Sequence, residues 1–91
     1  MINLKPLQIA NKIIELSGVN VFENSRQRKY IEVRSLLTYM LRNKLNMRWT
    51  NIALFYTKNG KPTTHATTIH SCIDYEMHKT HNKKLQEIEN M

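Results

Sequence analysis

Apolar side chains recur three and four positions apart in several stretches of this chain, and no window alternates apolar with polar residues as a half-buried strand does. This spacing predicts amphipathic helices and the all-α class. The chain has 91 residues, which is enough for one domain and leaves no room for a second independent core. We therefore expect one small helical bundle. Its core should lie within residues 4–78, followed by a C-terminal tail at 79–91 that extends the last helix or frays.

Helix-ending residues and the apolar spacing together define the expected elements. Pro6 suits a first helical turn, Gly18 suits a C-terminal cap, and Thr63 or Thr64 can cap the last helix. The expected helices span 6–18, 28–45, 48–56 and 64–78, with a turn at 57–62. The residues expected to be buried are Ile9, Ala10, Ile13, Ile14, Leu16, Val21, Phe22, Tyr30, Val33, Leu37, Met40, Leu41, Leu45, Trp49, Ile52, Ala53, Tyr56, Ala66, Ile69, Ile73 and Met77, with Leu85 and Ile88 as anchors of the tail.

Positive charge is concentrated in the middle of the chain. The formal net charge is +7 and the sequence pI is about 9.8. Residues 26–61 hold nine lysines and arginines against Glu32 alone, whereas residues 1–25 sum to zero and residues 62–91 to −1. A balance this basic indicates a polyanionic partner (nucleic acid or an anionic membrane surface) or merely a soluble basic protein. Its concentration in one segment favours a surface that tracks phosphates.

Several classes of function are disfavoured. The single cysteine, Cys72, cannot form an intramolecular disulfide, so we expect a reducing cytoplasm. We expect no secretion signal, lipid anchor or membrane partner, because the chain lacks the apolar runs and terminal residues that these need. It also lacks paired carboxylates, an activated nucleophile and a G-x-x-x-x-G-K-[ST] loop, so we expect no enzyme activity, no bound nucleotide and no cofactor.

The four histidines and Cys72 raise the alternative of a metal site. His65 and His70 are five positions apart, about 140° around a helix, so they do not converge. His78 and His81 could share an ion but provide only two ligands. We therefore expect no metal, and we expect Cys72 to be a small core residue.

A short helix, a turn and a second helix with a polar N-terminus follow one another in residues 48–78, which is the plan of a helix-turn-helix. In that motif the first residues of the second helix face base edges in the major groove. Here they are Thr63, Thr64, His65, Ala66, Thr67 and Thr68, which offer hydrogen bonds and contact with thymine methyl groups. Without the basic segment before them, these threonines would indicate only helix capping.

Other side chains allow two interpretations. Arg34, Thr38 and Arg42 recur every four residues on an exposed line of the second helix, where they form either phosphate contacts or an ordinary solvated face. Trp49 and Tyr56 could stack on bases, but their helical spacing favours core packing.

Residues 26–77 resemble the C-terminal DNA-binding domain of the bacterial chromosomal replication initiator DnaA. Three blocks carry the resemblance, in order: Arg26-Gln27-Arg28 with the helix from Val33 to Leu41, then Ile52-Ala53-Leu54-Phe55-Tyr56, then His65-Ala66-Thr67-Thr68-Ile69-His70-Ser71. They match the family's arginine pair and following helix, the first helix of its helix-turn-helix, and its recognition motif with both histidines. The resemblance implies sequence-preferring binding of double-stranded DNA, in replication initiation or its regulation.

The resemblance also implies roles for individual residues. Arg26 stands where the family inserts an arginine into the minor groove, and His65 where a histidine reads a base in the major groove. The residues expected to read bases are Arg26, Thr64, His65, Ala66 and Thr67. Those expected to contact phosphates are Arg28, Arg34, Ser35, Arg42, Thr50, Lys58, Lys61, Thr63 and His70.

The chain departs from the family at several points. The turn at 57–64 is longer, Thr64 replaces a base-reading aspartate, and Ala53 and Ala66 replace a glycine and a threonine. These 91 residues contain no counterpart to the nucleotide-binding motor that precedes this domain in full initiators. These departures leave two alternatives, a protein–protein adaptor on the same fold and non-specific nucleic-acid binding. A monomer is expected, because no surplus apolar stripe is evident.

Overall fold

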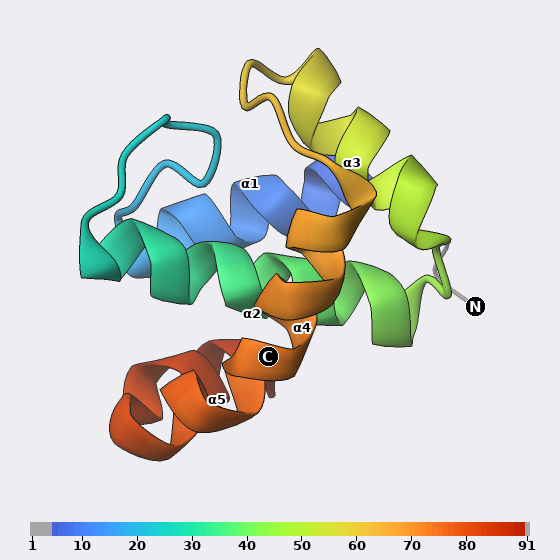
Figure 1. Cartoon of the computed structure of the whole chain (residues 1–91). Helices are drawn as coiled ribbons and strands as arrows, with labels where there is room; N and C mark the ends of the chain where they lie inside the picture. The colour runs from blue at the N-terminus through green and yellow to red at the C-terminus, as the bar shows by residue number, and fades with distance from the viewer. Residues whose placement is uncertain (1–4, 91) are drawn as a thin grey trace.

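The computed structural model describes residues 5–90, which form five helices joined by short loops (Figure 1). The helices are α1 (Pro6–Ser17), α2 (Arg28–Lys44), α3 (Trp49–Lys58), α4 (His65–His81) and α5 (Lys83–Glu89). Residues 5–90 contain no strand, and the predicted all-α bundle is confirmed. None of the helices described is long and apolar enough to span a lipid bilayer.

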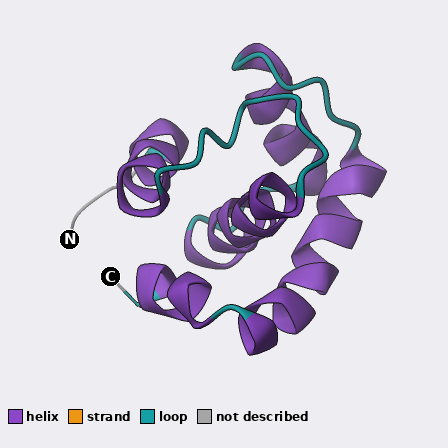
Figure 2. Cartoon of the chain, turned by 90° about the vertical axis from the view of Figure 1, so that its left-hand side faces the viewer, coloured by secondary structure: helices purple, strands orange, loops and turns teal. Residues whose placement is uncertain are grey.

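Helix α2 lies at the centre and packs against each of the other four helices. In a view along its axis, α1 lies on one side and α4 on the other (Figure 2). Because α2 is surrounded, its buried face is wider than an apolar stripe alone predicts. It buries Glu32, Val33, Ser35, Leu36, Leu37, Thr38, Met40 and Leu41. Tyr30 and Leu45, which were expected to be buried, are only half-buried.

The helix ends follow the predicted caps at two places. Gly18 ends α1 with a φ of 72°, a left-handed conformation that glycine adopts without strain. The hydroxyl of Thr64 accepts a hydrogen bond from the amide of Thr67 and caps α4. Helices α3 and α4 continue past their predicted ends, to Lys58 and His81. Local signals therefore place the beginnings of these helices better than their ends.

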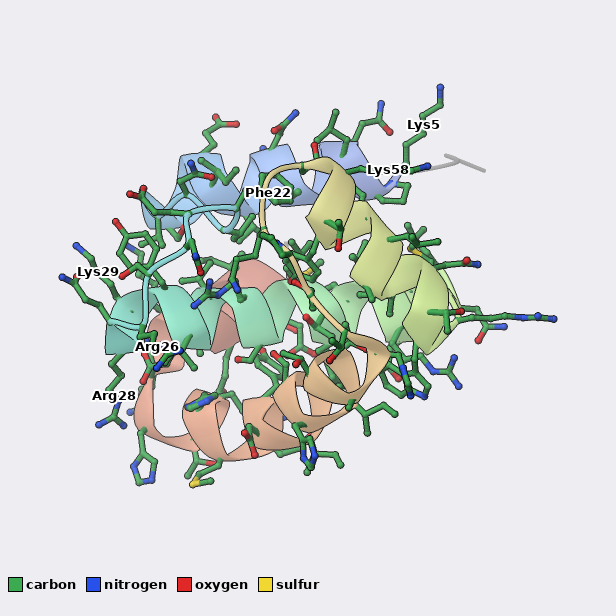
Figure 3. All side chains as sticks on the ribbon, turned by 45° about the horizontal axis from the view of Figure 1, so that its top comes forward. Lys5, Phe22, Arg26, Arg28, Lys29 and Lys58 are labelled. Carbon is green, nitrogen blue, oxygen red and sulfur yellow. The ribbon has the colours of Figure 1, made fainter. Side chains whose placement is uncertain are left out.

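Most of the core predicted in α1 and α3 is confirmed. Ile9, Ala10 and Ile13 of α1 and Ile52, Ala53 and Tyr56 of α3 are buried, and Ile14, Leu16 and Trp49 pack against them partly exposed. In the loop after α1, Val21 is fully buried. Phe22, labelled in Figure 3, makes edge-to-face contacts with Phe55 and Tyr56, with ring centroids 5.6 and 6.2 Å apart.

The segment after residue 82 belongs to the core. Leu85 and Ile88 of α5 are 1% and 5% exposed and lie in the same apolar cluster as the buried residues of α1 and α2. Helix α5 packs against α1, α2 and α4. The core therefore extends beyond residue 78, and α5 is a helix of its own rather than an extension of α4.

The predicted buried face of α4 is wrong. Ile73 and Met77 are 64% and 59% exposed, Ala66 is exposed, and Ile69 is half-buried. Thr68 and Tyr75 are buried instead. The ring of Tyr75 lies 4.7 Å from that of Tyr39, and its hydroxyl donates to a carboxylate oxygen of Glu89 at 2.5 Å. Burying this large aromatic ring between α2 and α5, with its hydroxyl paired, outweighs the smaller gain from the aliphatic stripe.

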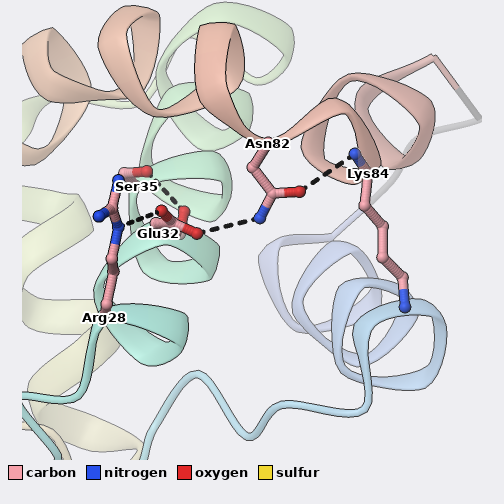
Figure 4. Close-up of polar contacts among 5 residues, drawn as sticks. All are labelled: Arg28, Glu32, Ser35, Asn82 and Lys84. Carbon is pink, nitrogen blue, oxygen red and sulfur yellow. Dashed lines mark hydrogen bonds and ion pairs between the residues drawn. The ribbon is translucent and has the colours of Figure 1, made fainter.

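A buried carboxylate joins α2 to the start of α5 (Figure 4). Glu32 is 7% exposed and accepts hydrogen bonds from Arg28 Nε at 2.9 Å and from Asn82 Nδ2 at 3.0 Å. The side-chain oxygen of Asn82, Oδ1, accepts a hydrogen bond from the backbone amide of Lys84 and caps the N-terminus of α5. Burial alone would raise the pKa of Glu32, but the hydrogen bonds from Asn82 and Arg28 and the charges of Arg28 and His78 leave this pKa below its usual value.

This carboxylate makes stability depend on pH. Because the pKa of Glu32 is lower in the folded state, its contribution is fully present above the unfolded pKa of about 4.3 and is lost as the pH falls through the folded value. Glu32→Gln is expected to lower the free energy of unfolding by about 1–3 kcal/mol at pH 7. This difference from the wild type should shrink as the pH falls through the folded-state pKa of Glu32, because the protonated carboxyl is neutral like the amide. Urea titrations at a series of pH values measure it, with the exposed Glu15→Gln as control. A pH-independent difference would contradict this assignment.

Candidate nucleic-acid interface

A groove of about 230 Å³ lies between α2 and α4 and is bordered by the α3–α4 turn. We call it the α2–α4 groove. It is lined by Ile31, Arg34, Ser35, Thr38, Tyr56, Lys61, Thr63, Thr67, Thr68, His70, Ser71, Asp74 and His78. Five of the residues expected to contact phosphates (Arg34, Ser35, Lys61, Thr63 and His70) and one expected to read bases (Thr67) therefore line one concave surface, although Ser35 is fully buried.

The wall formed by α2 and α3 is held by buried hydroxyl groups. The Tyr56 hydroxyl lies 2.9 Å from Thr38 Oγ1 and donates to the carbonyl oxygen of Arg34 at 3.0 Å. Burial raises the pKa of Tyr56, although its contact with Thr38 and the charge of Arg34 oppose this, and the hydroxyl stays protonated. Tyr56 is 2% exposed, so it packs in the core as its spacing predicted and presents no ring for stacking on a base.

Arg34, Thr38 and Arg42 do not form the exposed line that their spacing predicted. Thr38 is 1% exposed. The guanidinium of Arg34 donates to the carbonyl oxygens of Glu23 and Ser25, at 3.0 and 2.5 Å. That of Arg42 donates to Met47 O at 2.9 Å and lies 4.6 Å from the ring centre of Trp49. This face of α2 is covered because α2 is central and the loops before and after it fold back over it.

Arg42 is therefore engaged between α2 and α3, where it fixes the connection at residues 45–48. Arg34 in turn fastens the loop that carries Arg26. Both guanidinium groups keep further N–H donors beyond those used here, since each carries five. Only Arg34 also lines the α2–α4 groove.

Arg34 and Lys61 line the groove, Arg26 lies near Lys61, and none of the three is in an ion pair within residues 5–90. Lys61 is half-buried, and burial, followed by the charges of Arg34 and Arg26, lowers its pKa. In residues 5–90 the ion pairs are Arg28 with Glu32 and Lys79 with Glu76, so none of these three side chains is in one. Like charges placed together in this way attract anions.

The first turn of α4 is available to a partner. His65, Ala66 and Thr67 are exposed, and the hydroxyl of Thr67 lies 3.1 Å from that of the capping Thr64. His70, one turn further, is exposed at the groove. The five residues expected to read bases are thus all exposed, four of them in this turn and Arg26 in the loop before α2.

The other residues expected to contact phosphates are either buried or lie outside the groove. Ser35 is fully buried and its hydroxyl donates to the carbonyl oxygen of Glu32, so it cannot reach a phosphate and this prediction is wrong. Arg28 is 72% exposed beside its partner Glu32. Thr50 and Lys58 are exposed at the two ends of α3, outside the groove. Figure 3 shows Lys58 projecting from the end of α3 and Arg26 and Arg28 close to the start of α2.

Four groove residues were not among the predicted site residues: Ile31, Ser71, Asp74 and His78. Asp74 and His78 follow Thr67 and Ser71 along α4 at intervals of four, three and four residues, and all four line the groove. This polar spacing was the available signal. Cys72, beside them, is half-buried, and burial raises the pKa of its thiol. Among residues 5–90 no three histidine, cysteine or acidic side chains are close enough to hold a metal ion.

The groove therefore combines unpaired cations, hydroxyl groups and imidazoles next to an exposed helix N-terminus. That chemistry suits phosphate and base edges. Comparison with protein-family models, with curated proteins and with solved structures gave no significant match for this chain.

Proposed function

We propose that this protein binds double-stranded DNA with a sequence preference, with α4 in the major groove and Arg26 in the neighbouring minor groove. One observation carries the proposal. Three cations without carboxylate partners and the exposed first turn of α4 lie around the same groove. Phosphate contacts would fix the position of the duplex, and the short side chains of the helix turn would read the bases.

Each part of the surface has a distinct task in this proposal. Lys61 neutralises backbone phosphate beside α4, and His65 and Thr67 offer hydrogen bonds to base edges. Arg34 has two tasks: its hydrogen bonds to Glu23 and Ser25 hold the loop that presents Arg26, and its remaining N–H donors can contact backbone phosphate at the groove. The likeness of the three sequence blocks to the DnaA domain suggests a role in replication initiation or its regulation. The helix-turn-helix arrangement of α3 and α4 forms part of the same proposal.

His65→Ala and Lys61→Gln are expected to affect duplex binding differently. Loss of a base-reading side chain should reduce the discrimination between a preferred and a mismatched duplex by about 1–3 kcal/mol. Loss of a phosphate contact should weaken all duplexes alike. Fluorescence anisotropy measures both, with a duplex carrying the DnaA family's recognition sequence, a scrambled duplex and a single strand as ligands.

Equal weakening on every duplex by His65→Ala would remove base reading from that residue. Tight binding without any sequence preference would instead indicate non-specific coating of nucleic acid. If neither duplex nor single strand bound, the proposal would be wrong.

An adaptor that binds a protein partner is the second candidate, and one observation favours it. Ile73 and Met77, one turn apart on α4, expose apolar surface to solvent. Exposed apolar side chains close together are a feature of protein contact sites. The adaptor predicts that DNA affinity is weak and equal for all sequences, so the anisotropy experiment separates the two candidates.

A further inference from the structure

The α2–α4 groove has polar groups that the fold leaves unused. In residues 5–90, neither Arg34 Nε nor Lys61 Nζ makes a hydrogen bond or an ion pair. The side chains of His70 and Ser71, which line the same groove, have no hydrogen-bond partner in that part of the chain either. Tyr56, Thr38 and Thr63, by contrast, are committed to neighbouring oxygens. The free groups include two fixed cations, and they share one recess.

We propose that the end of this groove at Arg34 and Lys61 binds the phosphate group of a small phosphate monoester. This proposal goes beyond duplex binding and stands whether or not the chain binds DNA. The recess holds about 230 Å³, which is small for a ligand site and fits a compact molecule. A monoester carries a charge of about −1.5 to −2 near neutral pH, so it gains more from two close cations than a singly charged diester does.

The groove is asymmetric along its length. Asp74 and His78 line it together with Ile31, and Asp74 makes no ion pair in residues 5–90. A carboxylate repels phosphate, so the phosphate belongs at the Lys61 end. The organic group that carries the phosphate then lies beside Ile31 and Asp74. Ile31 can pack against an apolar part of this group, and the carboxylate of Asp74 can accept a hydrogen bond from a donor on it. Like-charge repulsion among Arg26, Arg34 and Lys61 is relieved when the anion binds.

The test is a titration followed by the backbone amide signals in two-dimensional NMR. Methyl phosphate is added at constant ionic strength, with sodium chloride as the balancing salt. Saturable shifts are expected for amides between residues 61 and 71, with a dissociation constant on the order of 1 mM. Lys61→Gln should weaken this binding at least about tenfold, because it removes a charge-assisted hydrogen bond. Lys58→Gln is the matched control, since Lys58 is exposed in the neighbouring turn of α3 and does not line the groove.

Two results would overturn the site. Shifts that grow linearly without saturating, or an equal loss of binding in Lys58→Gln and Lys61→Gln, would show diffuse attraction to positive charge. Dimethyl phosphate, a diester like the DNA backbone, is expected to bind at least about fivefold more weakly than methyl phosphate because its charge is smaller. If it binds equally well, the monoester is wrong and the contact belongs to nucleic-acid backbone.

A parallel titration with duplex DNA separates this inference from the proposed function. Saturable methyl phosphate binding with no duplex binding would support the groove site and remove the DNA proposal. Duplex binding without saturable methyl phosphate shifts would remove the groove site and leave the DNA proposal standing.

Discussion

Leu85→Ala is expected to lower the free energy of unfolding by about 2–5 kcal/mol. Leu85 is 1% exposed and lies in the main apolar cluster, in a helix that packs against α1, α2 and α4. Removing its side chain leaves a cavity at the point where these elements meet, and the lost burial and the cavity both cost free energy. A domain of this size has a total stability of only about 5–10 kcal/mol, so the loss is a large fraction. Urea denaturation followed by circular dichroism measures it.

Leu54→Ala is the matched control, because Leu54 is 54% exposed on α3 and the chemical change is the same. It should alter stability by no more than about 0.5 kcal/mol. If Leu85→Ala cost as little as this control, α5 would be an appendage that unfolds without the rest of the domain. Residues 79–91 would then behave as the C-terminal tail that the sequence pattern predicted.

Sequence patterns predicted the buried faces of α1 and α3 well because the information there is local. In α1 and α3 one apolar stripe faces one core, so the spacing of Ile9 and Ile13, or of Ile52 and Tyr56, is enough. Gly18 and Thr64 acted as caps because capping depends on residues within one turn.

The buried face of α4 could not be predicted in the same way. Its aliphatic stripe through Ile73 and Met77 competes with Tyr75, whose burial depends on partners far away in sequence, Tyr39 and Glu89. Hydrophobic spacing counts the aliphatic residues but does not register that an aromatic ring with a paired hydroxyl can replace them. Tertiary packing decided the orientation of this helix.

The candidate site was only partly predictable for a related reason. The concentration of charge in residues 26–61 was visible in the sequence, and the groove does contain Arg34 and Lys61. Which cations stay unpaired depends on long-range contacts. Spacing along α2 could not reveal that Arg34 reaches back to Glu23, or that Ser35 is buried. Local sequence thus predicted that cations gather in one part of the fold better than it predicted the contacts of each one.

Raising the salt concentration from about 50 to about 200 mM is expected to weaken duplex binding by roughly 10²-fold. This factor corresponds to about four phosphates neutralised by Arg26, Arg28, Arg34 and Lys61. Each contact adds about −0.9 to the slope of log K against log salt. Such a dependence arises because bound cations release the ions condensed on DNA. Anisotropy titrations at four or five salt concentrations measure the slope.

Two substitutions assign that slope to one face of the molecule. Lys61→Gln should reduce its magnitude by about one unit. Lys12→Gln removes the same charge from the exposed side of α1, which lies across α2 from α4 (Figure 2), and should leave the slope unchanged. Equal changes in both variants would mean that net charge, and not the α2–α4 face, holds the duplex. A slope near zero in the wild type would mean that phosphates are not contacted, and the exposed apolar face of α4 would then become the surface to study.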